Sequence, residues 1–514
     1  MPFKHLLIIY LIQVLLVFLP SFGLARLFKK AGVESWKAFI PFYNTSIMET
    51  LARRPRHWVF WQFIPVVGWF ITPGIFIEFV KLFGKFSVGA HTLAALLAPV
   101  YFPYIAYKED VKYLGPDAVK KHKKSTAREW FDAAIFAIVA ATLIRTFVFE
   151  AYTIPSGSME KSLLVNDFLF VSKLSYGPRL PNTPLSIPFI HNYVPGTSWK
   201  SYSTAIKIPY IRWWASPVKR GDAVVFNFPA GDTVINLPDY QSAHPYYQVL
   251  REEGRGDEEQ GRKIVLSDPT KYPLAVHPAD KSDNYIKRCV AVAGDSVKIV
   301  NGTVYVNNQI SPLPPKSQMD YLVITNGQVF DADILKEEYG VDNSDHRQVQ
   351  ILGNNAYQMT LTAEAVEKMK KNGFARQITP VLADSLSYAD PALAKWVTMN
   401  KWTIDNYGPI WIPKKGVVLP LNEHNYYIYE RPIRVYEHND FYMKDGKFYL
   451  NGKEVTSYTF KMDYYWMMGD NRHQSQDSRF WGFVPEDRVV GKAWLIWFSW
   501  EGGPRWNRLF RFVK

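Results

Sequence analysis

The feature that most constrains this chain is an apolar run between Trp130 and Phe149, long enough to cross a bilayer. Three further segments, 5–24, 58–80 and 88–107, have a similar length and composition. The last two carry prolines, which membrane helices tolerate when they have neighbours. We therefore predict a multi-span α-helical membrane anchor, with three spans in 1–127 and a fourth within 128–150.

The first segment has a second interpretation. The stretch PSFGLA at its end offers the small residues of a cleavage site, so 5–24 could be a cleavable signal peptide. The segment is long for that role, and the basic loop after it would have to be translocated, so we favour an anchor.

Loop charge predicts the orientation. Loops 25–57 and 108–128 each hold seven Lys and Arg residues, and the positive-inside rule places both in the cytoplasm. Everything after Phe149 then lies outside. We expect a multi-pass protein of the cytoplasmic (inner) membrane, with its large C-terminal part on the periplasmic or outer side.

The formal charge of +13 does not indicate a nucleic-acid partner. The basic residues are concentrated in loops between apolar segments, without the Lys/Arg and aromatic stripe of RNA-binding domains. Cys289 is the only cysteine, so an internal disulfide is excluded.

After Asp167 the pattern is one of short alternating strands broken by Gly, Pro and Asn, which predicts a mainly β, antiparallel domain. Helical spacing appears at Leu361–Gly373. Segments 300–310 and 444–455 resemble each other, which we attribute to hairpin turn chemistry. The predicted parts are a β-rich core (151–310 and 444–500, with an insertion at about 230–280), an inserted subdomain (311–443) and a basic aromatic tail (501–514).

Three stretches carry residues suited to acyl transfer: PSGSM, NYIKRCVAVAGD and MMGDNRHQSQDSR. A serine hydroxyl needs a base to become a good nucleophile. Lys287, in a strand-like run beside Ile286 and Cys289, would be partly desolvated, which lowers an amine's pKa and lets it accept a proton. Taken singly, these stretches read as a linker, a solvated strand face and an Asx-rich turn. Their joint occurrence, in this order, favours a catalytic site.

These stretches resemble the sequence boxes of type I signal peptidase, a membrane-anchored Ser/Lys protease with a β-sheet domain that removes signal peptides from exported preproteins. The resemblance covers about 150–229, 281–310 and 460–500. It implies that Ser158 is the nucleophile, Lys287 the general base and Ser156 a donor to the oxyanion hole. It further implies that Ser475 positions Lys287 and that Asp477 and Arg479 brace the site. The pockets for small P1 and P3 side chains would be formed by Ile154, Met159, Leu163 and Ile286.

The sequence departs from the family pattern at three places. Lys161 and Ser162 stand where the family usually has Pro-Thr, and Asn166 stands in place of the Gly before Asp167. His473 and Gln474 replace the commoner Asp-Asn. None of these is the nucleophile, the base or the oxyanion serine, so the departures bear on the shape of the substrate groove.

We predict a membrane-bound serine endopeptidase that acts on exported preproteins at the surface of membrane lipids, with no cofactor. The eleven histidines show no metal-binding spacing, so no metal is expected. Four tryptophans near the C-terminus suit either a headgroup surface or a core strand followed by a solvated tail: Trp494, Trp497, Trp500 and Trp506. The alternatives are an inactive membrane-anchored β scaffold that binds preproteins, and a Ser/Lys processing protease of narrow specificity.

Overall fold

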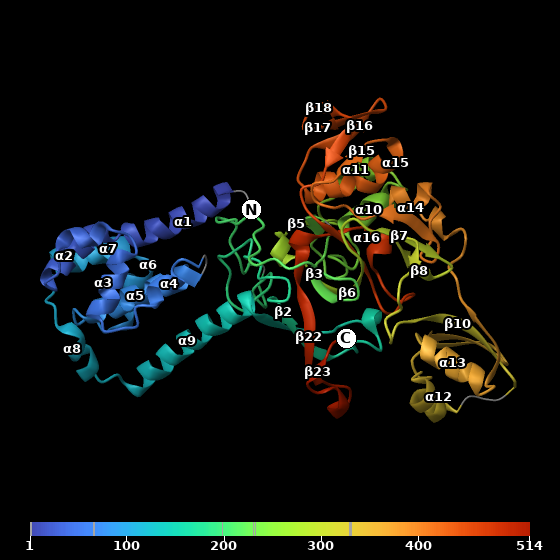
Figure 1. Cartoon of the computed structure of the whole chain (residues 1–514), viewed down its shortest axis with the longest axis horizontal. Coiled ribbons are helices and arrows are strands. Elements are labelled where there is room, and N and C mark those ends of the chain that lie inside the picture. The colour runs from blue at the N-terminus through green and yellow to red at the C-terminus, as the bar shows by residue number, and fades with distance from the viewer. Residues whose placement is uncertain (1–2, 65–66, 198, 230, 232, 328–330) are drawn as a thin grey trace. The chain divides into compact units, whose positions relative to one another are not determined.

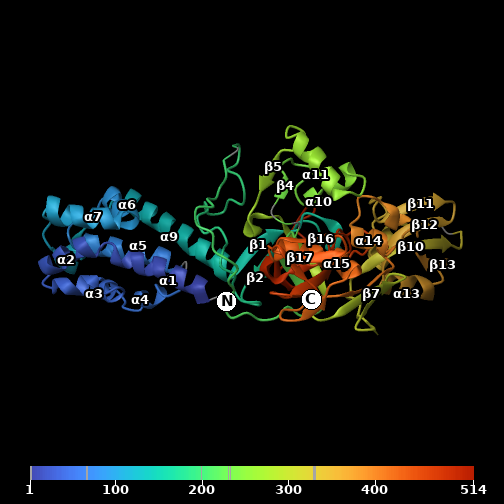
Figure 2. The ribbon, with the colours of Figure 1, turned by 90° about the horizontal axis from the view of Figure 1, so that it is seen from above.

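The computed structural model describes residues 3–64, 67–197, 199–229, 231, 233–327 and 331–514. The chain forms two compact units. One comprises Met1–Arg145 and Pro184–Ile211, and the other comprises Thr146–Thr183 and Arg212–Lys514. The first is built from helices and a long irregular segment, and the second is mainly β (Figures 1 and 2).

The N-terminal helices enclose an apolar core whose buried side chains include Leu24, Phe28, Phe79 and Phe102. The helices up to the start of the β structure are α1 Phe3–Phe18, α2 Ser21–Lys30, α3 Tyr43–Leu51, α4 Trp58–Trp61, α5 Val67–Lys81, α6 Val88–Leu96, α7 Ala98–Pro103, α8 Gly115–Lys121 and α9 Thr126–Phe147.

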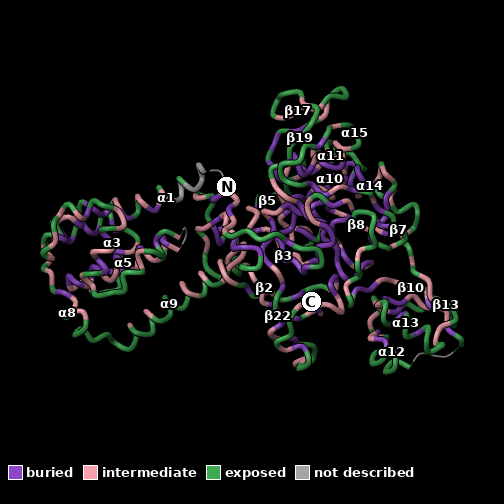
Figure 3. Tube along the Cα trace, in the orientation of Figure 1, coloured by how far each residue is buried: buried purple, intermediate pink, exposed green. Residues whose placement is uncertain are grey.

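Helix α9 is the clearest candidate for a membrane span. Among the described residues it is the only unbroken helix that is both long and apolar enough to cross a bilayer, and none of its residues is buried within the protein. Figure 3 shows it exposed or half-exposed along its length. The predicted run ended at Phe149, but Phe149 already belongs to strand β1 (Phe149–Thr153).

The other predicted spans are interrupted. Segment 5–24 bends by 45° between Tyr10–Phe18 and Ser21–Lys30, and segment 88–107 bends by 114° at the start of α7. Pro20 lies in the first break and Pro99 in the first turn of α7, where each removes a backbone donor. Segment 58–80 divides into α4 and α5, with 65–66 outside the described residues. Counting each bent pair as one span gives up to three, so a multi-span anchor stays a prediction.

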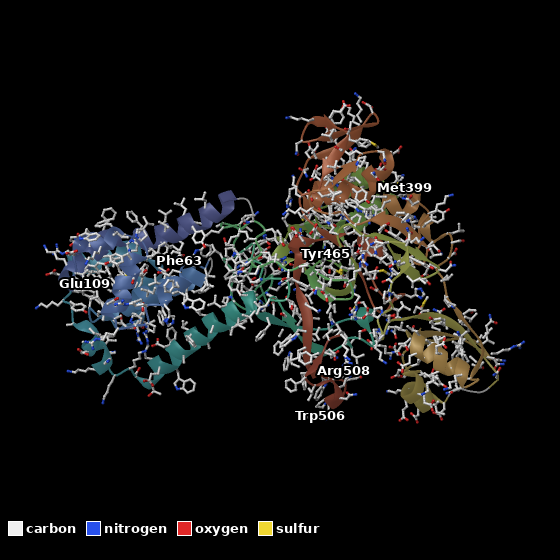
Figure 4. The ribbon with its side chains drawn as sticks, viewed as in Figure 1. Phe63, Glu109, Met399, Tyr465, Trp506 and Arg508 are labelled. Atoms are coloured by element: carbon white, nitrogen blue, oxygen red, sulfur yellow. The ribbon has the colours of Figure 1, made fainter. Side chains whose placement is uncertain are left out.

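The C-terminal unit is organised around a mainly antiparallel sheet, as the sequence predicted. Its order is β1-β2-β22-β3-β6-β20-β21, with β23 paired to β22. Its further strands are β2 Asp167–Ser172, β3 Ala223–Asn227, β6 Asn284–Ala291, β20 Tyr464–Met468, β21 Val484–Pro485, β22 Val489–Ser499 and β23 Arg511–Phe512. Alternate burial along β2 and near-complete burial of β3 and β20 show that this sheet carries the core. Tyr465 of β20 lies within it (Figure 4).

A second sheet, of order β14-β7-β8-β9, packs on one large cluster of buried aromatic and aliphatic side chains. Its strands are β7 Ser296–Val300, β8 Thr303–Val306, β9 Gln309–Ile310 and β14 Tyr407–Trp411. Strand β14 falls within the predicted insertion 311–443 but pairs with β7. The limits of the inserted subdomain therefore stay a prediction. A separate sheet within it covers a shorter part of the chain than 311–443.

That separate sheet has the order β11-β12-β10-β13 and carries two helices on one face. Its elements are β10 Gln318–Thr325, α12 Ala332–Tyr339, β11 Val349–Gly353, β12 Ala356–Thr362, α13 Ala363–Lys371 and β13 Ala375–Pro380. Helix α13 confirms the helical spacing read at Leu361–Gly373. Figures 1 and 2 both show these elements gathered as one group, which we call the inserted sheet.

The remaining α-helices and strands are short. They are β4 Thr233–Ile235, α10 Tyr246–Glu253, α11 Glu258–Ser267, β5 Leu274–Val276, α14 Lys395–Met399, β15 Val418–Pro420, α15 Glu423–Arg431, β16 Phe441–Lys444, β17 Lys447–Leu450, β18 Lys453–Val455, β19 Ser457–Thr459 and α16 Ser478–Trp481. The two similar segments are both hairpins, and Asn301 and Asp445 take the positive φ that their turns require.

The C-terminal tail is tied to the sheet. Strand β23 pairs with β22, and the buried Arg508 guanidinium donates to both carboxylate oxygens of buried Asp167, at 2.9 Å for Nε. Trp506 is exposed at this end of the sheet (Figure 4). The tail thus combines a packed ion pair with an exposed aromatic surface.

We predict that Arg508→Ala lowers the free energy of unfolding of this unit by about 3–5 kcal/mol, because it leaves the Asp167 carboxylate buried without its partner. Denaturant unfolding of the detergent-solubilised protein measures this change. Arg511→Ala, three residues along and exposed, is the matched control and should change stability by less than about 0.5 kcal/mol. Equal losses in the two variants would contradict a stabilising role for the Arg508 pair.

Candidate active site

The serine of PSGSM lies on a tight turn after the first strand of the main sheet. Strand β1 ends at Thr153, and Gly157–Met159 form one turn of 3₁₀ helix. Ser158 is 9% exposed. Its carbonyl accepts a hydrogen bond from the backbone N–H of Asn471 at 3.1 Å, and the Asn471 side chain donates to the Gly157 carbonyl at 3.1 Å. The loop that contains GDNR therefore fixes the turn that carries the serine.

Lys287 comes from β6 and meets Ser158 directly. Its Nζ lies 2.6 Å from Ser158 Oγ, a hydrogen-bond distance, and the residue is only 3% exposed. The amine also lies 5.4 Å from the centre of the Tyr285 ring, so Lys287 and Tyr285 share a face of the strand as the alternation predicts. The structure thus brings together the two residues expected to form a dyad.

Burial lowers the pKa of the Lys287 amine from its ordinary 10.5 to about 8. The carboxylates of Asp477 and Asp470 raise it, whereas the Arg479 charge lowers it further. At a pKa of 8 roughly one tenth of the amines are neutral at pH 7, against about 0.03% for an unshifted lysine. The environment therefore suits this amine to accept a proton near neutral pH.

Each of these two carboxylates has its own arginine. Arg479 donates to Asp477 through Nε and a terminal nitrogen at 2.9 and 2.8 Å, and Arg288 donates to Asp470 through Nε at 3.1 Å. All four side chains are buried. Burial alone would raise the pKa of the Asp477 carboxyl, but Arg479 holds it below its ordinary value. The structure thus pairs Asp477 with Arg479, and their bracing role stays a prediction.

Gly469 is required by the close approach of the GDNR loop (469–479, called the catalytic loop for its proposed role) to the serine turn. A Cβ at this position would lie 2.2 Å from Ser475 Oγ and 2.5 Å from the Ser158 carbonyl oxygen. No side chain fits there without moving one of the two. Gly469 and Asn471 were not singled out from the sequence, although both belong to the GDNR motif.

The two supporting serines differ in their surroundings. Ser156 is exposed and lines the same cavity as Ser158 and Lys287, as a donor to a developing oxyanion would. The Ser475 hydroxyl is buried, and no hydrogen-bond partner for it lies among the described residues. Its expected contact with Lys287 is thus not seen, and a positioning role for Ser475 stays a prediction.

A cavity of about 840 Å³ is lined in part by Ser158 and Lys287. Ile154 and Ile286, two of the four residues expected to form substrate pockets, line it. Met159 and Leu163, the other two, do not line it, and both are fully buried in an apolar cluster that also contains Ile154. Among the described residues, no group of three or more His, Cys, Asp or Glu side chains is placed to hold a metal ion.

Two departures from the expected boxes have a structural reason. Lys161 and Asn166 have φ of 69° and 62°, in the left-handed region. A proline, fixed near −65°, could not occupy the position of Lys161, so the turn after Ser158 follows a path that proline would forbid. Asparagine tolerates the left-handed region well, as glycine does, so Asn166 suits the position before Asp167.

The comparisons with known proteins agree with this geometry. The model of the family "Signal peptidase, peptidase S26" matches residues 127–356 and 420–500, together more than half of the chain. A family of unknown function (DUF5684) matches residues 36–116 in the N-terminal region.

Several relatives are called signal peptidase I. The proteins from Buchnera aphidicola (subspecies Acyrthosiphon pisum) and Haemophilus influenzae are 23% and 24% identical over 76% of this chain, covering 84% and 77% of their own length. The Aquifex aeolicus protein is 24% identical over 71% of this chain and 82% of its own length. Since the family model covers more than half of the chain, including Ser158, Lys287 and the GDNR loop, the chain belongs to the signal peptidase family, peptidase S26, and is a serine endopeptidase.

Proposed function

We propose that this endopeptidase removes N-terminal signal peptides from exported preproteins, with Ser158 as nucleophile and Lys287 as general base. The observation that carries the proposal is the 2.6 Å hydrogen bond between Lys287 Nζ and Ser158 Oγ in a nearly buried site. The relatives named signal peptidase I support this substrate class.

In the proposed mechanism, Ser158 Oγ attacks the carbonyl carbon of the scissile peptide while the neutral Lys287 amine takes the hydroxyl proton. The negative charge that develops on the carbonyl oxygen is stabilised by the Ser158 backbone N–H and the Ser156 hydroxyl, a contribution often worth about 3 kcal/mol. The Lys287 ammonium then protonates the leaving amine, and an acyl-enzyme on Ser158 remains. Water, deprotonated by Lys287, hydrolyses this ester and restores the serine.

We place the reaction on the outer side of the cytoplasmic membrane. Basic loops 25–57 and 108–128 favour the cytoplasm, and α9 follows the second of them. Only Val148 separates the end of α9 from β1, and Ser158 follows β1 closely along the chain. A signal peptide also leaves the bilayer at this height, so a nucleophile carried just after a span can reach the junction it cuts.

An inactive scaffold is the weaker alternative, because a binding protein has no need of a lysine that is costly to bury beside a serine hydroxyl. A processing protease of narrow specificity stays open. The cavity is lined in part by residues of the insertions, which could select among substrates.

We predict that Ser158→Ala and Lys287→Met each lower kcat/KM at least about 10³-fold, since one removes the nucleophile and the other the base. Cleavage is measured with a preprotein bearing small P3 and P1 residues and detergent-solubilised enzyme. Lys298→Met is the matched control. Lys298 also lies over a tyrosine ring, at 5.2 Å, but on β7 and outside the cavity. Near-normal cleavage by Lys287→Met would eliminate the dyad assignment.

We also predict an acid limb in the pH profile. Below about pH 8 the Lys287 amine is protonated and cannot accept the serine proton, so kcat/KM should fall about tenfold per pH unit as pH decreases. Above that pH the amine is neutral and the rate should level off. Thermal unfolding across the same range separates protonation from loss of fold. A rate independent of pH between about 6 and 9 would argue against a lysine base.

A further inference from the structure

The cavity that Ser158 and Lys287 help to line has walls from both insertions. Besides Ser158 and Lys287, its lining includes Ser242 and Ala243, which fall in the insertion of about 230–280, and residues of the inserted sheet. The part contributed by the inserted sheet consists of Asp320, Arg347, Gln350, Gln358 and Thr360. Most of these side chains end in an amide or a hydroxyl.

These residues lie together because of the pleat of the sheet. Gln350 pairs with Gln358 across β11 and β12, and Asp320 pairs with Thr360 across β10 and β12. Residues directly opposite each other in an antiparallel pair point to the same face. The intervening Met359 points the other way and is buried in the apolar cluster formed with α12 and α13. The inserted sheet thus has one apolar face on its own helices and one polar face, which we call the polar wall.

The polar wall is attached to the GDNR loop, which also fixes the turn that carries Ser158. Backbone hydrogen bonds join Gln318 N to the Asp470 carbonyl at 2.9 Å and Arg472 N to the Gln318 carbonyl at 2.8 Å. His473 accepts from the Asp320 N–H through Nδ1 at 3.0 Å, and its Nε2 lies 3.1 Å from Asp405. Because the same loop fixes the Ser158 turn, the wall keeps a set position relative to the nucleophile.

The second side of the cavity is held by the same loop. The Gln476 side-chain oxygen lies 3.3 Å from the Tyr285 hydroxyl, and its amide nitrogen lies 3.5 Å from the Ala243 carbonyl. Gln476 stands between Ser475 and Asp477 in sequence. Both walls are therefore attached to one short segment of the catalytic loop.

The two charged side chains of the polar wall, Asp320 and Arg347, both have hydrogen-bond or ion-pair partners in the protein. The Asp320 carboxylate accepts from Thr360 Oγ1 at 2.6 Å and faces the His473 ring at 3.7 Å. The Arg347 guanidinium forms two hydrogen bonds of 3.0 Å with Asp345. Gln350, exposed, and Gln358, half-buried, present neutral amides instead. An amide both donates and accepts, and so suits a peptide backbone or an uncharged polar side chain.

We propose that the polar wall is a subsite for the polypeptide substrate beyond the two pockets for small side chains, and that it selects uncharged polar residues over apolar ones near the cleavage site. The subsite rests on the proposed function, since it presupposes an extended preprotein in the cavity. Gln350 and Gln358 are then its specificity-determining residues. Leucine in place of a polar substrate residue would desolvate both amides and offer them no hydrogen bond, so that, among the described residues, Gln358 would keep only its 3.4 Å hydrogen bond to Asp320.

The test compares preproteins with the same small P3 and P1 residues, in which the flanking positions on either side of the bond carry Asn or Leu. Wild type should cleave the Asn set with about 3- to 10-fold higher kcat/KM, the range expected for the loss of one hydrogen bond. In Gln350→Ala and in Gln350→Ala/Gln358→Ala this ratio should fall toward one. Gln350→Glu, which keeps the size but adds a charge, should gain preference for a Lys-flanked substrate relative to Gln350→Ala.

Gln377→Ala is the matched control, because Gln377 is exposed on β13 of the same sheet but does not line the cavity. Its substrate ratio should equal that of wild type, and thermal unfolding verifies that all variants are folded. Wild-type cleavage of both sets at the same rate, or a ratio that survives Gln350→Ala/Gln358→Ala, would overturn the subsite and leave the proposed function standing. Failure of wild type to cut either set would overturn both.

Discussion

The rest of the site depends on the contact between a nearly buried amine and a serine hydroxyl. Lys287 Nζ lies 2.6 Å from Ser158 Oγ, and burial lowers the pKa of this amine because a desolvated ammonium is costly. Two carboxylates close by, Asp470 and Asp477, act against this lowering. Each is bound to a buried arginine, Arg288 or Arg479, which limits the field that it exerts on the lysine. The two ion pairs thus let the site contain structural carboxylates and still hold a lysine with a lowered pKa.

The GDNR loop, which carries both carboxylates, also sets the position of the serine turn. It packs so closely on the serine turn that position 469 must be glycine, and it donates through Asn471 to that turn. The same loop is fastened to the inserted sheet through His473. The positions where the boxes depart from the family pattern include those that contact the insertion: Lys161 donates to the Gly340 carbonyl, and Gln474 to the Arg347 carbonyl. These two departures therefore attach the site to the segment between α12 and β11.

The sequence alone predicted those features that depend on residues close together in the chain. Strand alternation placed Lys287 on the face of Tyr285, turn residues predicted the hairpins, and spacing predicted helix α13. It was insufficient where a contact joins distant segments. The pairing of Arg288 with Asp470 and of Gln318 with Asn471 has no local signature, so the second ion pair and the attachment of the inserted sheet went unpredicted. Composition alone also did not predict the bends of 45° and 114° within segments 5–24 and 88–107, and the multi-span anchor stays a prediction.

The topology explains how such a core can accept large insertions. Strands β3 and β6 are antiparallel neighbours, and Asn227 at the end of one pairs with Asn284 at the start of the other. The insertion between them begins and ends at adjacent points of the sheet, so it leaves the register of Lys287 intact. Closing a longer loop costs little more free energy than closing a short one. These strand ends also border the cavity, where Asn284 is part of the lining. The insertion therefore contributes Ser242 and Ala243 to the cavity while the pairing of β3 with β6 keeps Lys287 in register, so the cavity wall and the position of the amine are set by different parts of the chain.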